Sequence, residues 1–123
     1  MKRELTSTDV EDLIVGATLL GVGGGGNPQK GLQNLRAQLD AGKKLMIWSL
    51  DEFSETDRFA SPYFVGSVAP EASKQAPKII TEDPIQVAFA ILEKHLGTKI
   101  TATIASEIGG GNTAASLAIA AKL

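Results

Sequence analysis

The sequence contains no cysteine and only one histidine, and aromatic residues make up 5% of it. Without cysteine the chain has no disulfide, no thiolate zinc site and no cysteine nucleophile. His95 falls late in a predicted helix, where an imidazole is typical of a partner for the helix dipole. No His, Asp and Glu residues have the spacing of metal ligands, so we expect no metal site within this chain, and the residues identify no cofactor.

Long apolar runs and an excess of basic residues are also missing. The apolar stretch Leu13–Leu20 contains Gly16 and Thr18 and is far shorter than the roughly 20 residues of a membrane helix. Acidic residues follow the basic start of the chain, where a signal peptide needs apolar residues. The formal charge is −2, with lysines and arginines scattered along the chain. We therefore expect a cytoplasmic protein that binds neither nucleic acid nor a membrane.

The residues that are present alternate between helix and strand signals. A capping box formed by Thr8 and Glu11 predicts a helix over residues 9–20, with a strand over 13–20 as the alternative. Further helices are predicted from Pro28 to just before Gly42, from Asp83-Pro84 to Gly97, and over 113–123. A buried strand is predicted over 44–49, and further strands over 63–68 and 99–105. The order predicts one α/β domain over residues 1–123, with helices layered on a partly parallel sheet.

Most of the 13 glycines gather in two places, Gly21–Gly31 and Gly109–Gly111. Both stretches lead into predicted helix starts, where backbone N–H groups and the helix dipole favour an anion or a polar carbonyl. The alternative is two tight turns without a ligand. Glu107 follows a predicted strand, the usual position for a ligand contact in an α/β sheet, and Asn112 fits either an N-cap or a ligand contact. We expect Glu107 and Gly23–Gly26 to share one cleft.

The first glycine stretch also matches a dinucleotide fingerprint, as Gly21-x-Gly23-x-x-Gly26. That fingerprint requires a strand before it and an acidic residue about 20 positions later, at the end of the next strand. Here a helix is predicted before it, and Asp40 lies within the second predicted helix. Nucleotide binding therefore remains only an alternative, and the phosphate-binding P-loop is excluded because no Gly-Lys-Ser/Thr follows.

Three segments carry a family resemblance: LLGVGGGGNPQKG (Leu19–Gly31), LMIWSLDEF (Leu45–Phe53) and EIGGGNTAASLAIAAKL (Glu107–Leu123). Together they resemble the amino-terminal domain of the S-methyl-thiohydantoin desulfurase-like family, whose members are often encoded beside hydantoinase and oxoprolinase-type enzymes. The family continues beyond the last of these segments, so the resemblance implies an α/β fold that is incomplete in this chain.

The resemblance implies an enzyme, or part of one, that acts on a small cyclic amide such as a hydantoin or thiohydantoin and removes a ring sulfur substituent by hydrolysis. Glu107 is the expected catalytic base or polar clamp, and the expected substrate-binding residues are Gly23, Gly24, Gly25, Gly26, Asn27, Gly109, Gly110 and Asn112. The alternative is a non-catalytic binding or assembly module that a partner chain completes.

The last predicted helix, over 113–123, is small or apolar nearly all round. Such a helix is normally buried on several faces. We therefore expect a homo-oligomer or a second chain to cover it, and an apolar patch near Leu117 and Leu123 in an isolated monomer.

Overall fold

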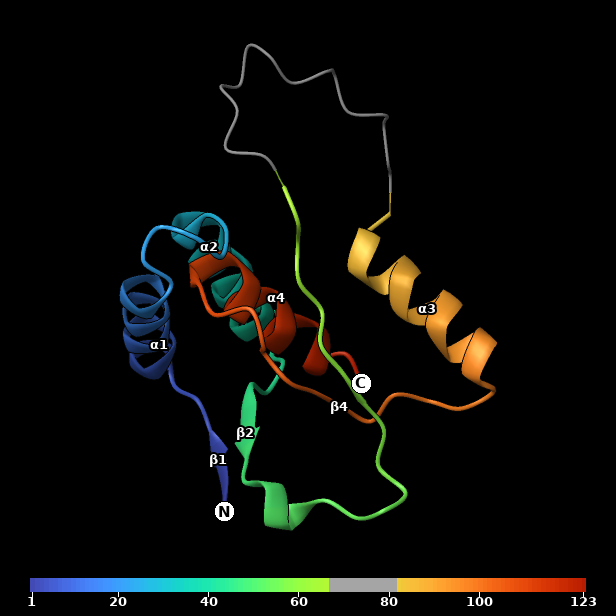
Figure 1. The fold of residues 1–123 in the computed structure, drawn as a ribbon. Helices are drawn as coiled ribbons and strands as arrows, with labels where there is room; N and C mark the ends of the chain where they lie inside the picture. Colours follow the sequence, from blue (N-terminus) through green and yellow to red (C-terminus); the bar gives the residue numbers. More distant parts are fainter. Residues whose placement is uncertain (67–81) are drawn as a thin grey trace.

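A computed structural model describes residues 1–66 and 82–123 of this chain, which form a mixed α/β fold (Figure 1). Its helices in the described ranges are α1 (Ser7–Leu20), α2 (Pro28–Asp40), α3 (Pro84–Leu96), α4 (Gly110–Ala120) and the short 3-10 turn η1 (Leu50–Glu52). Its strands are β1 (Lys2–Glu4), β2 (Met46–Trp48), β3 (Phe59–Ala60) and β4 (Ala102–Thr103). No helix in these ranges has both the length and the apolar composition needed to cross a membrane.

The strands form two separate pairs. Strands β1 and β2 are antiparallel, with Arg3 opposite Ile47, and β3 and β4 are parallel, with Phe59 opposite Ala102. The predicted α/β class with a partly parallel sheet is confirmed. The strand predicted over 63–68 is wrong, because the chain pairs at β3 instead and residues 61–66 form no ladder; residues 67 and 68 lie outside the described part.

Strand β2 lies within the predicted range of 44–49 but is not buried as expected. Only Leu45, beside it, is fully buried, while Ile47 and Trp48 are 41% and 39% exposed. Trp48 is covered locally instead, since its ring stacks on Phe53 at 5.3 Å and lies 3.8 Å from the Lys2 Nζ. Strand β1 was not predicted because Lys-Arg-Glu has no apolar alternation.

Helix starts follow local side-chain caps. Asn27 caps α2 as predicted, with its Oδ1 accepting from the Lys30 N–H at 3.0 Å. The capping box of α1 lies two residues before the predicted one. There the Asp9 N–H donates to the Thr6 hydroxyl at 3.2 Å, and the Thr6 N–H donates to the Asp9 carboxylate at 2.8 Å. An ion pair between Arg3 and Asp9 adds to the capping box of Thr6, which explains why this box forms in place of the predicted one.

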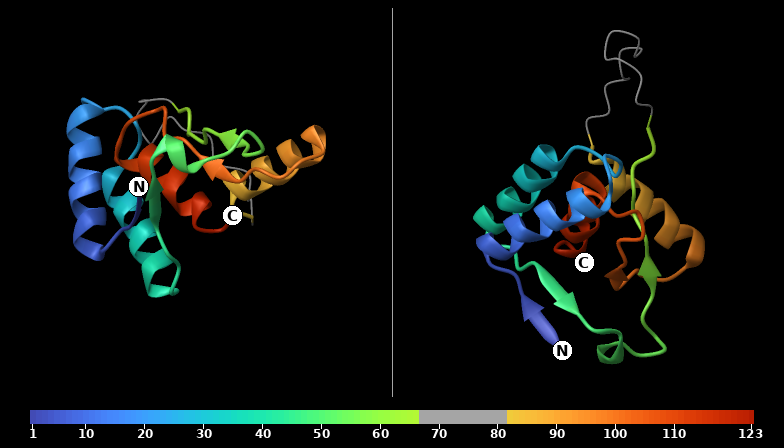
Figure 2. Two further views of the ribbon diagram at one scale, coloured as in Figure 1. Left: turned by 90° about the horizontal axis from the view of Figure 1, so that it is seen from below. Right: turned by 60° about the vertical axis from the view of Figure 1, so that its left-hand side comes forward.

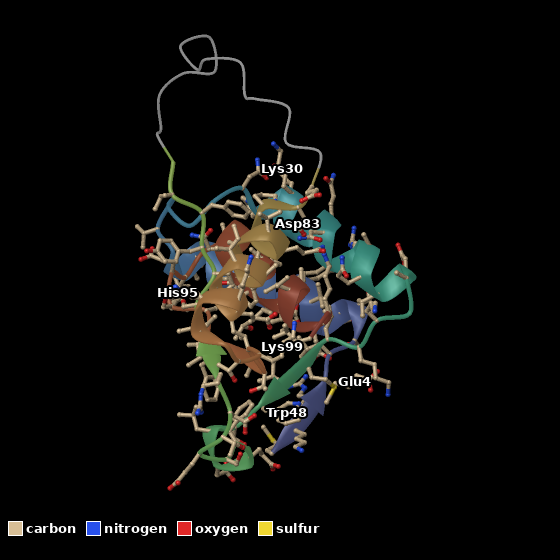
Figure 3. The ribbon with its side chains drawn as sticks, turned by 90° about the vertical axis from the view of Figure 1, so that its right-hand side faces the viewer. Glu4, Lys30, Trp48, Asp83, His95 and Lys99 are labelled. Carbon is tan, nitrogen blue, oxygen red and sulfur yellow. The ribbon has the colours of Figure 1, made fainter. Side chains whose placement is uncertain are left out.

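Helix α3 begins at its Asp83 cap and ends at Gly97, which has a left-handed φ of 65° as predicted. Its apolar face is mostly in water, because Phe89 alone is buried and Leu92 and Leu96 are exposed. Figure 3 shows His95 near the C-terminal end of α3, at the opposite end from Asp83. That position agrees with the expected role of His95 beside the helix dipole.

The main core lies where α1, α2 and α4 meet, with α4 between these two helices and α3 (Figures 1 and 2). Its buried members are Leu5, Val10, Ile14, Leu35, Leu45, Ala114 and Ala118. The expectation that α4 is uncovered in an isolated chain is wrong, because most of α4 is buried within its own chain, while an oligomer or a second chain stays a prediction. Leu117 is half-buried in this core, and the exposed apolar side chain at this end is Leu123.

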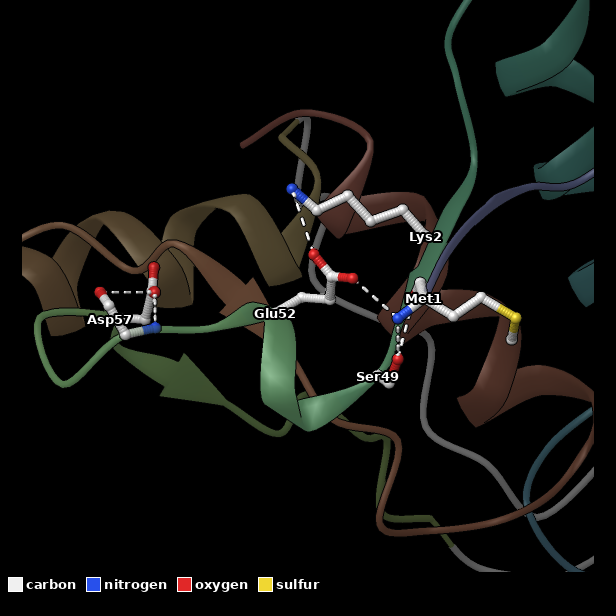
Figure 4. Close-up of polar contacts among 6 residues, drawn as sticks. Met1, Lys2, Ser49, Glu52 and Asp57 are labelled. Carbon is white, nitrogen blue, oxygen red and sulfur yellow. Dashed lines mark hydrogen bonds and ion pairs between the residues drawn. The ribbon is translucent and has the colours of Figure 1, made fainter.

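The acidic segment between β2 and β3 was expected to be a solvated connection. Asp51 and Glu55 are exposed, in agreement with that expectation. Glu52, in contrast, accepts from the Met1 amino group at 2.8 Å, as Figure 4 shows. Asp57 accepts from the Ser54 N–H at 2.7 Å and the Thr101 hydroxyl at 2.8 Å, so it joins this segment to the start of β4.

The bonds to Asp57 predict a pH dependence of stability. The Ser54 N–H, followed by the hydroxyls of Thr101 and Ser54, lowers the pKa of Asp57 below its ordinary value of 3.8. A carboxylate with a lowered folded-state pKa stabilises the fold above its unfolded pKa, and this contribution is lost as pH falls through the folded pKa. We expect Asp57→Asn to lower the urea midpoint at pH 7 but to have a smaller effect near pH 2. An Asp51→Asn control should change neither midpoint, and an equal loss for Asp57→Asn at both pH values would contradict the prediction.

Candidate functional site

The parallel pair β3–β4 defines an edge at which both strands end. Residues 61–65 follow β3 and residues 104–108 follow β4, so both segments leave the sheet on the same side. In α/β sheets the carboxyl ends of parallel strands are the usual location of ligand contacts. Glu107 lies in the second segment, and its side chain is exposed. The structure thus places Glu107 where the sequence predicted it.

Two hydroxyl groups and a buried amide lie at the same edge. The Oγ atoms of Ser61 and Ser106 are 2.5 Å apart, although the residues are 45 positions apart in the sequence. Asn112, which is 4% exposed, accepts a hydrogen bond from the Phe64 N–H at 3.0 Å through its Oδ1. The sequence did not indicate Ser61 or Ser106, because only the pairing of β3 with β4 brings them together. Their position directly after strands is the one available signal.

The two glycine stretches pack directly on each other at the start of α4. The Gly25 carbonyl accepts from the Gly111 N–H at 3.0 Å and from the Asn112 N–H at 2.8 Å. The sequence predicted one cleft shared by Glu107 and Gly23–Gly26, and that cleft stays a prediction; the contact observed joins the two glycine stretches. The loop joins α1 to α2, as predicted, so the strand required by the dinucleotide fingerprint is absent before it.

Close backbone contact explains most of these glycines. A Cβ on Gly25 would lie 2.4 Å from the Gly109 Cα, and one on Gly109 would lie 2.3 Å from the Gly25 Cα. A Cβ on Gly31 would lie 2.1 Å from the Gly110 carbonyl oxygen, where α2 crosses α4. Gly23 differs, because a Cβ added there would have no neighbour within 4 Å. Packing therefore requires Gly25, Gly31 and Gly109 whether or not a ligand binds.

Four N–H groups at the two helix starts already have acceptors. In α2, the Lys30 N–H donates to the Asn27 side chain and the Gly31 N–H to the Asn27 carbonyl. In α4, the Gly111 and Asn112 N–H groups both donate to the Gly25 carbonyl. The interpretation that these helix starts offer free donors to an anion is therefore wrong for these four groups. The N-cap of α4 is Gly109, so the alternative that Asn112 is an N-cap is also wrong.

Further backbone donors are in the first loop. Within residues 1–66 and 82–123, no acceptor bonds to the N–H groups of Gly23, Gly25 or Gly26, whereas Gly24 donates to the Gly21 carbonyl at 2.8 Å. Gly25 is half-buried, and Gly23 and Gly26 are exposed. Gly23 and Gly26 are thus the exposed members of the predicted donor set whose N–H groups have no acceptor.

A hollow of about 560 Å³ lies elsewhere, between α3, β4 and the end of α4. Its floor contains Phe89, Ile100 and Ile119, and its two lysines are paired with carboxylates, Lys99 with Glu93 at 2.6 Å and Lys122 with Asp83 at 3.1 Å. Both lysines are thus paired, so neither offers the hollow an unpaired positive charge. In the described ranges, no three His, Asp or Glu side chains gather closely enough to hold a metal ion.

The geometry defines a mixed α/β domain whose exposed polar groups meet at the carboxyl edge of a parallel strand pair, beside a glycine junction. Residues 8–123 match the family described as S-Me-THD-like, N-terminal domain, and the chain belongs to this family. No curated protein and no solved structure matches the chain.

Proposed function

We propose that this chain contributes the N-terminal domain of an enzyme that hydrolyses a sulfur substituent from hydantoin- or thiohydantoin-like five-membered rings. The observation that carries this proposal is the family match over residues 8–123. The carboxylate and hydroxyl groups gathered at the edge of β3 and β4 support it, because a hydrolase needs a base and hydrogen-bonding groups in one place.

In this proposal water attacks the ring carbon that bears the sulfur. A C–O bond forms, the C–S bond breaks, and a ring carbonyl remains. Glu107 takes one proton from the attacking water and returns it to the departing thiolate, so that a thiol leaves and the carboxylate is restored. The second proton of the water passes to the ring nitrogen, whose double bond to this carbon opens as the carbonyl forms. The N–H groups of Gly23 and Gly26 donate to the ring atom on which negative charge develops. Asn27 and Gly110 flank this loop junction and shape its walls.

Titration of the chain with S-methyl-thiohydantoin and hydantoin, followed by amide NMR, tests the proposal. We expect the largest shifts at Gly23, Gly26, the segment from Ser106 to Gly109 and the residues that directly follow β3. NAD and ATP serve as controls, because they test the alternative of nucleotide binding. Shifts with a nucleotide and none with either ring would overturn the proposal. Thiol release can be followed in parallel with a thiol-reactive dye.

A second candidate function is an assembly module that binds another copy or a second chain. The apolar outer face of α1 favours it, because Val15, Leu19 and Leu20 are 70%, 78% and 70% exposed. Adjacent apolar side chains of this size commonly mark a protein–protein contact. The candidate contact surface is therefore on α1, whereas the sequence predicted it on α4.

If the outer face of α1 forms such a contact, Leu19→Glu should weaken self-association about 10- to 100-fold, since a buried leucine contributes roughly 1.5–3 kcal/mol. Sedimentation velocity over a concentration series measures the change. Asp12→Asn, at an exposed polar position on the same helix, should leave association unchanged. A wild-type chain that stays monomeric at every concentration would contradict self-association through this face.

A further inference from the structure

The hydroxyl groups of Ser61 and Ser106 form a pair that the proposed mechanism does not use. Their Oγ atoms are 2.5 Å apart and either one can be the donor. Both residues are exposed, and within the described residues neither hydroxyl has another hydrogen-bond partner. Two exposed serines would each be satisfied by water, so the fold gains little stability from joining them. The pair therefore faces solvent with hydrogen-bonding capacity to spare.

The hydrogen bonds that the pair can still form follow from the composition of a hydroxyl group, which has one proton and two lone pairs. When one serine donates to the other, the second serine keeps its own proton for an outside acceptor. The first serine keeps a lone pair for an outside donor. The pair thus has one donor and one acceptor to offer, on oxygens 2.5 Å apart, and the hydroxyl hydrogens can rotate toward a common ligand.

A ring amide presents the complementary pattern. A five-membered ring holds its amide cis, so that N–H and C=O lie on one edge, whereas an open-chain amide is trans and points them in opposite directions. Bond lengths of about 1.33 Å for C–N and 1.23 Å for C=O place the ring N and O roughly 2.3 Å apart. This separation is close to that of the two serine oxygens, so two nearly parallel hydrogen bonds fit.

We propose that Ser61 and Ser106 together bind the cis-amide edge of the ring substrate and determine specificity for a cyclic over an open-chain amide. This inference rests on the proposed function, which supplies the ring as ligand. The position of the pair supports it, because Ser106 directly precedes Glu107 and both serines lie at the edge where β3 and β4 end. A ring held there is next in sequence to the residue that the proposed mechanism uses as base. The Ile108 carbonyl continues the same segment to the Gly25 contact.

Two ligands test the pair: hydantoin, which has a cis-amide edge, and N-acetylglycine N-methylamide, an open-chain compound whose two amides are trans. Isothermal titration with the full chain gives the ratio of their affinities. We expect Ser61→Ala and Ser106→Ala each to weaken hydantoin binding about tenfold, the typical effect of one lost hydrogen bond, with little change for the open-chain compound. The preference for hydantoin should therefore fall about tenfold in each variant. A purely structural role would lower both affinities together.

Ser7→Ala, at an exposed serine of α1, is the matched control and should keep the wild-type ratio. Urea midpoints of all variants show whether each is folded. Wild-type binding of hydantoin with an unchanged ratio in both serine variants would overturn the specificity role and leave the proposed function standing. A wild-type chain that binds no ring, hydantoin and S-methyl-thiohydantoin included, would overturn both.

Discussion

Gly25→Ala is expected to lower the free energy of unfolding by about 2–5 kcal/mol, a large part of the stability of a domain of this size. Gly25 has a φ of 74°, which costs an alanine roughly 1–2 kcal/mol. The new methyl would also lie 2.4 Å from the Gly109 Cα, an overlap that backbone cannot relieve easily and that adds typically 1–3 kcal/mol. Urea denaturation followed by circular dichroism measures the loss.

Two other glycines separate the effects of conformation and overlap. Gly23→Ala should cost only about 1–2 kcal/mol, because its φ is 88° but nothing lies within 4 Å. Gly16→Ala, within α1 and also without a neighbour within 4 Å, should raise stability by roughly 0.5–1 kcal/mol. Equal losses for Gly25→Ala and Gly23→Ala would show that the two glycine stretches are not in contact.

Glu107→Gln is expected to lower the rate of thiol release about 10²- to 10⁴-fold, the usual contribution of a general base. The amide keeps the size of the side chain but cannot take a proton from water. Stability should not change, because Glu107 is exposed and no described residue bonds to its carboxylate. The rate is followed with S-methyl-thiohydantoin in whichever form of the enzyme is active. Glu55→Gln, which alters an exposed acid outside the site, should leave the rate unchanged.

A Glu107→Gln variant with an undiminished rate would remove Glu107 from the mechanism. If the rate is retained but ring binding weakens, Glu107 acts as a polar clamp and another group must supply the base. Amide shifts on ring titration distinguish these outcomes, because they report binding independently of turnover.

Helix boundaries were predictable because their signals are local. Asn27 and Asp83 cap helices through bonds to residues two or three positions away, and Gly97 ends α3 by its own backbone angle. The start of α1 shows the limit of such signals. Thr6 and Thr8 both suit a cap, and Arg3, outside either motif, adds an ion pair to the first of them.

Strands and the site depended on distant contacts. Residues 63–68 carry a stronger strand pattern than Phe59–Ala60, but pairing with β4 decides which residues form the ladder. The glycine stretches posed a different problem, because glycine is required equally by a ligand and by close backbone packing. Only the position of Gly109 against Gly25 distinguishes these causes. The contact between Ser61 and Ser106 involves only one residue from each segment, so no repeating pattern in the sequence predicts it.

Amide hydrogen exchange of the wild-type chain tests most directly whether the two glycine stretches pack as one junction beside Glu107. The Gly111 and Asn112 N–H groups donate to the Gly25 carbonyl, whereas those of Gly23 and Gly26 have no acceptor among the described residues. The packed junction predicts slow exchange at Gly111 and Asn112, comparable to the core of α4, and fast exchange at Gly23 and Gly26. Exchange at Gly111 and Asn112 as fast as at Gly23 would contradict it.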